Sequence, residues 1–147
     1  MNDIQEIKLE KHDTKDIHDS HVNGSLTVIW RDWDEIIKNH PKMVYVSSVN
    51  PGEIKGPHIH LKRHSYFTCV SGEVVFIIQK NNTYVEIKSN PETPYIIHIP
   101  PNLATAHINI SNEVSKILVL TDVAWRPNDG EMKNISFENY NWEKWKK

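Results

Sequence analysis

Short stretches of alternating apolar and polar residues dominate this chain from residue 25 onward. Residues 25–30 alternate in this way, which is typical of a half-buried β-strand. Turn-forming runs such as Asn50-Pro51-Gly52 and Ser71-Gly72 separate the later stretches. The predicted strands cover residues 43–49, 58–61, 66–70, 73–79, 83–88, 95–99, 105–110 and 116–121. Strands at such regular spacing predict an all-β sandwich or barrel.

The two ends of the chain differ from this central region. Residues 2–20 are rich in charged side chains with little apolar periodicity, so we expect a loosely held arm or a strand that pairs with a partner subunit. Near the other end, Trp142 and Trp145 are expected to cover the barrel core or one of its edges. The predicted organisation is an N-terminal arm, residues 1–21, followed by one β-barrel domain, residues 22–147.

Composition and charge exclude several function classes. The chain has 147 residues, 24% of them charged and 38% apolar, as expected for one globular domain. Its net charge of -2 gives no broad attraction for nucleic acid. Its apolar runs are too short to span a bilayer, and no secretory signal follows Met1. The single cysteine, Cys69, fits a reducing cytoplasm, where we expect the protein to reside.

The most informative feature is the placement of the nine histidines. His58 and His60 are two residues apart on a predicted strand, so both side chains point to the same face. Gly72 follows, and a proline turn at residues 99–101 precedes His107. A histidine pair on one strand face suits either metal ligation or acid–base chemistry at a pocket wall.

Metal binding is one interpretation of this pattern. His58, His60, His64 and His107 together offer four imidazole ligands for a divalent transition metal. However, Lys62 shares the predicted strand parity of the pair, and its ammonium group would repel a cation. The motif also contains no carboxylate that would offset this positive charge. We therefore favour a site without metal or other cofactor.

The pattern resembles the two-part signature of the cupins, a glycine before a His-x-His pair, a later glycine and a histidine after a proline turn. Within the cupins it is similar to the metal-free, RmlC-like enzymes of sugar-nucleotide metabolism. The stretch 56–64 resembles the motif of the dTDP-4-keto-6-deoxyglucose 3,4-ketoisomerases. Lys55-Gly56 before His58, together with Gly72-Glu73-Val74, is similar to the dTDP-4-dehydrorhamnose 3,5-epimerases. The resemblance implies a double-stranded β-helix or jelly-roll barrel with a short C-terminal segment.

The resemblance also implies an isomerase that moves a proton next to the ketone of a nucleotide-linked 4-keto-6-deoxyhexose, in surface polysaccharide or deoxysugar biosynthesis. His58 is the expected base, and His60, His107 or Lys62 the expected partners of the enolate oxygen. Tyr66 and His64 are candidates to return the proton. The expected substrate-binding residues are Lys55 and Arg63 at the diphosphate, an aromatic platform such as Trp30 at the base, and Tyr45, which is also a weaker proton-return candidate.

Departures from both families leave the reaction open. The epimerases have a lysine where this chain has Ser65, and a tyrosine on the last barrel strand, where this chain has only aliphatic residues. The ketoisomerases usually have a tyrosine in place of Pro57 and lack the histidine after the proline turn. Two alternatives therefore remain, a metal-dependent dioxygenase or isomerase, and a non-catalytic sugar-binding cupin. The resemblance also implies a homodimer with strands exchanged or packed between subunits.

Overall fold

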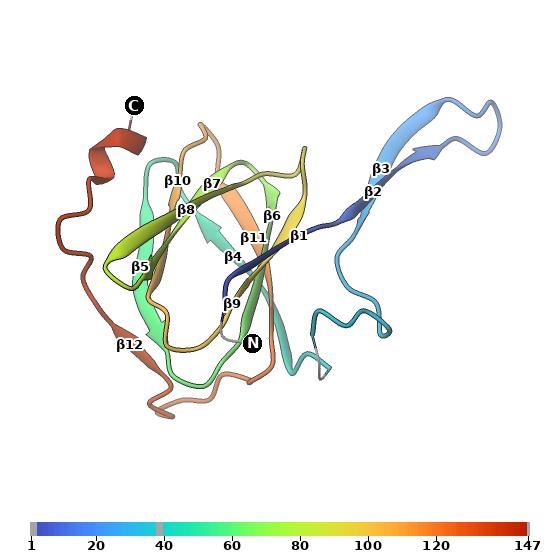
Figure 1. Ribbon diagram of the computed structural model, residues 1–147. Coiled ribbons are helices and arrows are strands. Elements are labelled where there is room, and N and C mark those ends of the chain that lie inside the picture. The colour runs from blue at the N-terminus through green and yellow to red at the C-terminus, as the bar shows by residue number, and fades with distance from the viewer. Residues whose placement is uncertain (1–2, 38–39, 147) are drawn as a thin grey trace.

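Two five-stranded antiparallel sheets face each other in the computed structural model, which describes residues 3–37 and 40–146 (Figure 1). The first sheet consists, in spatial order, of β1 (Gln5–Lys8), β9 (Tyr95–Ile99), β6 (Ser65–Ser71), β11 (Ser115–Thr121) and β4 (Met43–Val49). The second consists of β12 (Met132–Asn134), β5 (Ile54–His60), β10 (Thr105–Asn109), β7 (Val74–Lys80) and β8 (Thr83–Ser89). Strands β2 (Glu10–Lys15) and β3 (Val22–Val28) form a separate hairpin.

This architecture confirms the predicted all-β double-sheet fold. Strands β4 and β9 match their predicted ranges, and β5 begins four residues earlier than predicted. Strand β12 was not predicted, because it is short and rich in polar residues. The arm was expected to hold at most one strand, which would pair with a partner subunit, whereas it holds β1, which pairs with β9 of the same chain, and β2. The only helical element in the described part of the chain is a 3₁₀ turn at Trp142–Trp145. No helix in that part has the length and apolar character needed to cross a membrane.

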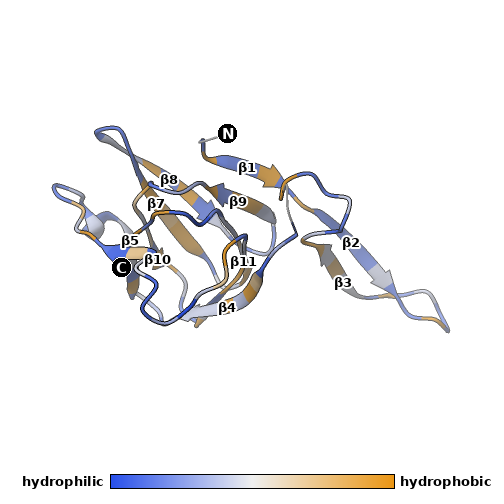
Figure 2. Ribbon diagram, turned by 90° about the horizontal axis from the view of Figure 1, so that it is seen from below, coloured by the Kyte–Doolittle hydropathy of each residue, from blue (hydrophilic) through white to orange (hydrophobic). Residues whose placement is uncertain are grey.

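The main hydrophobic core lies between the two sheets. It includes Phe76, Ile97, Ile117 and Val119, each with an exposed fraction of zero. Strand β7 is apolar at five consecutive positions rather than alternating, because both of its faces are covered. Phe76 faces the inner core, while Ile77 faces outward under the C-terminal segment. Figure 2 shows hydrophobic stretches along the strands of both sheets.

The C-terminal segment covers the outer face of the second sheet. Phe137 is buried there, and Tyr140, Trp142 and Trp145 pack around it. The Trp145 indole N–H donates a hydrogen bond of 2.7 Å to the Tyr140 hydroxyl group. The expectation that the two tail tryptophans cover the barrel is therefore confirmed.

The N-terminal region belongs partly to the barrel and partly to the projecting hairpin. Strand β1 pairs with β9 at the edge of the first sheet. Strands β2 and β3 pair with each other and extend away from the barrel (Figure 1). This hairpin crosses residue 21, the expected border between arm and barrel, and that division into two units stays a prediction.

Gly72 occupies the turn between β6 and β7, where no other residue fits without rearrangement. Its φ of +78° is left-handed, and a Cβ atom built on it would lie 2.9 Å from the Ser115 Cα atom. Glycine avoids both the backbone strain and the overlap. Gly52 has a similar φ of +76°, but a Cβ atom there would have no neighbour within 4 Å.

We expect Gly72→Ala to destabilise the fold more than Gly52→Ala does. Left-handed strain alone costs about 1–3 kcal/mol in either variant, and only the Gly72 variant adds overlap with Ser115. Urea unfolding followed by tryptophan fluorescence measures the two free energies of unfolding. Equal losses for the two variants would contradict the close contact at Ser115.

Candidate functional site

A cavity of about 710 Å³ opens between the two sheets. His58 and His60 from β5 and His107 from β10 line it. Tyr45 from β4, apolar core side chains such as Phe67 and Val119, and most of the segment 125–131 also line it. The histidines predicted from two distant parts of the sequence therefore meet at one cavity.

Strand alternation brings the histidines together. On β5, His58 and His60 face the cavity, while Ile59 packs on the outer side with the second hydrophobic cluster. Strand β10 lies beside β5, with Thr105 opposite His58. The register shifts between Thr105 and His107, so that His107 stands opposite Lys55.

Glu131 is the principal partner of His60, and it was not foreseen from the sequence. Its carboxylate lies 2.7 Å from His60 Nδ1 and accepts hydrogen bonds from the backbone N–H groups of Lys62, at 3.0 Å, and Arg63, at 3.2 Å. Burial opposes ionisation of Glu131, but these N–H donors and His60 together hold its pKa below the usual value. The group is therefore a buried carboxylate that is ionised at neutral pH.

His60 and His58 have partners of different charge. Burial lowers the pKa of His60, an effect that its hydrogen bond to the Glu131 carboxylate opposes and the charge of Arg63 reinforces. His58 Nδ1 lies 3.0 Å from the Oδ1 atom of Asn134, a neutral amide. Glu131 and Asn134 both come from β12 or the residue before it. The short edge strand β12 and the residue before it therefore supply the partners of both histidines.

His107 is the most deeply enclosed of the three histidines. Its Nε2 atom is buried and has no hydrogen-bond partner. Burial, reinforced by the positive charges of Lys55 and His58, lowers the pKa of His107 to about 4. His107 is consequently a neutral imidazole at pH 7 with an unused polar atom.

Two basic residues and a tyrosine also line the cavity at different depths. Lys55 is exposed and donates a hydrogen bond of 2.9 Å from its Nζ atom to Ser47 Oγ. Arg63 is buried, with its Nε atom 3.4 Å from the Glu131 carboxylate. Burial raises the pKa of Tyr45 despite the nearby charge of Arg63. These three predicted residues do line the cavity.

His64 and Tyr66 do not line this cavity, which corrects their expected location. Both face a second cavity of about 640 Å³ at the N-terminal strand. Their rings stack with that of His98, and His64 Nδ1 lies 2.8 Å from His98 Nε2. Strand β6 starts at Ser65, and its alternation turns Phe67 inward and Tyr66 outward.

Lys62 and Trp30 also lie elsewhere. The side chain of Lys62 was expected to share the strand face of His58 and His60. It does not, because β5 ends at His60 and the exposed Lys62 follows in a bend. Trp30 lines a third depression with His40 and Lys42. Trp125 is the aromatic residue at the rim of the histidine cavity, with an exposed fraction of 62%.

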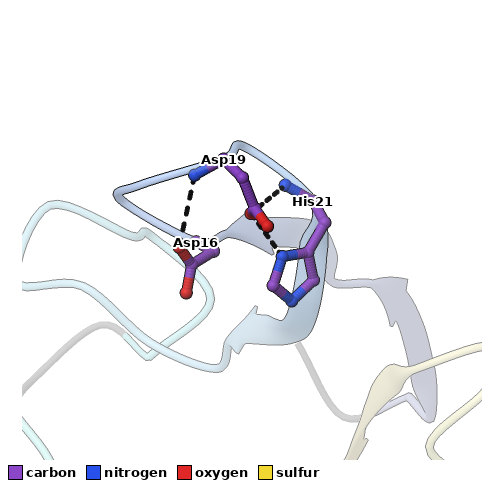
Figure 3. A group of neighbouring side chains, drawn as sticks. All are labelled: Asp16, Asp19 and His21. Atoms are coloured by element: carbon purple, nitrogen blue, oxygen red, sulfur yellow. Dashed lines mark hydrogen bonds and ion pairs between the residues drawn. The ribbon is translucent and has the colours of Figure 1, made fainter.

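The four-histidine metal set considered above is not assembled, since His64 lies in the other cavity. In the described part of the chain, three potential ligand atoms come within 4.8 Å of one another only at Asp16, Asp19 and His21 (Figure 3). This group lies at the tip of the hairpin, where Asp16 and Asp19 accept hydrogen bonds from backbone N–H groups of the turn. The turn itself accounts for their proximity.

The sequence did not reveal Glu131 and Arg126 as cavity residues, or Asn134 as the partner of His58. Glu131 lies 71 residues from His60 along the chain, so no local spacing connects them. The only local signal is the run Asn128-Asp129-Gly130, which predicts a turn before Glu131. That turn directs the chain back to the edge of β5.

Comparisons with known proteins give one family and several similar folds. The family model described as FdtA: WxcM-like, C-terminal matches residues 5–142. A dTDP sugar isomerase from Desulfovibrio desulfuricans G20 is similar in fold, with a TM-score of 0.79 at 15% identity over 95% of this chain and 90% of that one. No curated protein sequence matches significantly.

Two further structures share the fold. QdtA from Thermoanaerobacterium thermosaccharolyticum, a sugar 3,4-ketoisomerase solved with TDP, has a TM-score of 0.70 at 21% identity over 97% of this chain and 90% of that one. NovW, a 4-keto-6-deoxy sugar epimerase from Streptomyces spheroides, has a TM-score of 0.71 at 14% identity over 90% of this chain and 68% of that one. These likenesses confirm the cupin fold.

We expect the depressed pKa of His107 to appear in the pH dependence of stability. The unfolded chain binds a proton at this residue below about pH 6.5, whereas the folded chain does so only near pH 4. Stability is therefore lost progressively as pH falls between these values. Urea unfolding at pH 7 and 4.5 should show a smaller loss for His107→Gln than for the parent protein.

The matched control is His18→Gln, which changes an exposed histidine of the hairpin. It should leave the pH dependence unchanged. A direct NMR titration of the His107 ring with a midpoint near 6.5 would contradict the assigned burial.

Proposed function

The chain belongs to the FdtA family of WxcM-like, C-terminal proteins, and we propose that it is a 3,4-ketoisomerase of a nucleotide-linked 4-keto-6-deoxyhexose. The observation that carries the proposal is the meeting of His58, His60 and His107 at one cavity. Imidazole is the side chain best suited to proton transfer near pH 7.

The reaction requires two proton movements, one between carbons and one between oxygens. His58 removes the proton from C3, and the electron pair forms a C3–C4 double bond while the C4 carbonyl oxygen becomes an enolate. His60 takes the proton of the C3 hydroxyl group and delivers it to the oxygen on C4. The C3 oxygen then becomes the carbonyl, and C4 takes the proton back from His58, so the product is an isomer.

The surrounding residues fit the remaining demands of this substrate. The buried Nε2 atom of His107 has no protein partner, and a neutral imidazole there can form a hydrogen bond with the sugar oxygens. Lys55 and Arg126 place positive charges at the rim of the same cavity, where a diphosphate can remain partly solvated. Trp125 offers an exposed ring for the base. The expected partner is thus the nucleotide sugar itself.

The test is incubation with TDP-4-keto-6-deoxyglucose in heavy water, followed by NMR of the sugar. We expect conversion to the 3-keto isomer with deuterium at C4, and exchange of deuterium into C3 of the remaining 4-keto substrate. His58→Asn should lower kcat at least about 100-fold, the range typical for removal of a general base. Metal removal with a chelator should leave the rate unchanged.

His64→Asn is the matched control, because this histidine lies in the second cavity. It should retain activity. Turnover that survives His58→Asn would contradict the assigned base, and deuterium at C5 would indicate epimerisation instead. Tight binding without exchange would favour a sugar-binding protein, and chelator-sensitive turnover a metal enzyme.

We also propose that the protein is a homodimer in which the hairpin and the outer face of the first sheet pack against a second copy. Val44 and Val46 on the edge strand β4 are each 56% exposed, and Val70 on β6 is 40% exposed. An isolated two-stranded hairpin is marginal in water, yet β2 and β3 extend away from the barrel (Figure 1). A second copy would cover both features.

We expect sedimentation to show a dimer that Val46→Glu weakens, because a charge on this face would be desolvated at the interface. Ile135→Glu is the control, since Ile135 is 39% exposed on the C-terminal segment. A monomer at all concentrations, or equal effects of the two variants, would exclude this interface.

A further inference from the structure

Glu131 takes no part in the proton transfers proposed above, yet it is the most heavily engaged side chain at the cavity. Its exposed fraction is 5%, and its carboxylate contacts His60, Arg63 and two backbone N–H groups. A buried carboxylate is costly unless its interactions repay desolvation. The arrangement around Glu131 meets that condition with four contacts.

The chemistry of the carboxylate determines the state of His60. An ionised carboxylate only accepts hydrogen bonds, so the 2.7 Å contact requires His60 Nδ1 to carry the proton. In the neutral ring, Nε2 then holds the lone pair. His60 lines the cavity, and its lone pair is available there to accept a proton.

His58 is not constrained in this way. Its partner is the Asn134 amide, which can present either an oxygen acceptor or an N–H donor to the ring after a flip. Both tautomers of His58 are therefore compatible with its surroundings. The two histidines of one strand differ in tautomeric freedom because their partners differ.

We propose that Glu131 is a positioning residue that locks His60 in the Nδ1–H tautomer and stabilises its imidazolium form during the reaction. The second half of this inference rests on the proposed function. The charged groups that face His60 are Glu131, Arg63 and His58, and Glu131 alone among them favours the protonated ring. The carboxylate therefore makes His60 a stronger proton acceptor than burial beside Arg63 would otherwise allow.

The decisive variant is Glu131→Gln, which keeps the shape but removes the charge and adds an N–H donor. Heteronuclear NMR of the His60 ring, assigned with His60→Asn, should show protonated Nδ1 in the parent protein and a mixture of tautomers in the variant. With the sugar substrate, kcat should fall roughly 10- to 100-fold, as for other second-layer partners of histidine, with KM little changed.

The dependence of kcat on pH gives a second measurement, which would not change if Glu131 only stabilised the fold. Loss of the carboxylate lowers the pKa of His60, so the acid limb of the kcat profile should move to lower pH. The matched control is Glu138→Gln, an exposed carboxylate on the C-terminal segment, which should leave tautomer, kcat and pH profile unchanged.

The two hypotheses fail in distinguishable ways. If the parent protein turns over no 4-keto sugar, the proposed function is wrong, while the NMR measurement still tests whether Glu131 fixes the tautomer of His60. A folded Glu131→Gln variant with an unaltered His60 tautomer shows that Glu131 does not fix it, whatever the activity. An altered tautomer with unaltered kcat and acid limb overturns the catalytic part of the proposal.

Discussion

The cavity depends on the antiparallel pairing of β12 with β5. Strand β12 has only three residues, and its register sets Met132 opposite His60 and Asn134 opposite His58. Directly opposed residues in such a pair have neighbouring side chains. The pairing therefore brings Asn134 to one histidine and Glu131, just before the strand, to the other. It also covers the edge of β5 that would otherwise expose unpaired backbone groups.

Much of the fold was predictable because clear turn-forming sequences separate the strands of this protein. Strands β4 and β9 were predicted to the residue, and the i, i+2 spacing correctly placed His58 and His60 on one face. The location of Tyr66 was not predictable in the same way, because the first five residues of β6 are covered on both faces and their sequence does not alternate clearly. The predicted orientation of Lys62 was wrong for a simpler reason: β5 ends before Lys62, so the alternation of a strand no longer sets the direction of its side chain. Glu131 and Asn134 required the tertiary fold, because no local pattern links them to β5.

The cavity contains a buried ion pair between Arg63 and Glu131, a neutral imidazole and exposed positive charges. Deep in the cavity, burial keeps His107 uncharged, with a pKa lowered to about 4. Lys55 and Arg126 are exposed at the rim. The exposed positive charges at the rim and the neutral His107 inside suit the proposed ligand, whose phosphates would stay near water while its uncharged sugar would lie in the interior.

The separation of 71 residues between His60 and Glu131 affects how the site forms as the chain leaves the ribosome. Domains begin to fold while the chain is being synthesised, and synthesis proceeds at about 5–20 residues per second. Strand β5 is thus exposed for several seconds before its final edge partner is translated. By the end of that interval β1 to β11 have been synthesised, while His60 still lacks its carboxylate. The histidine cavity is consequently completed only late in the synthesis of the chain.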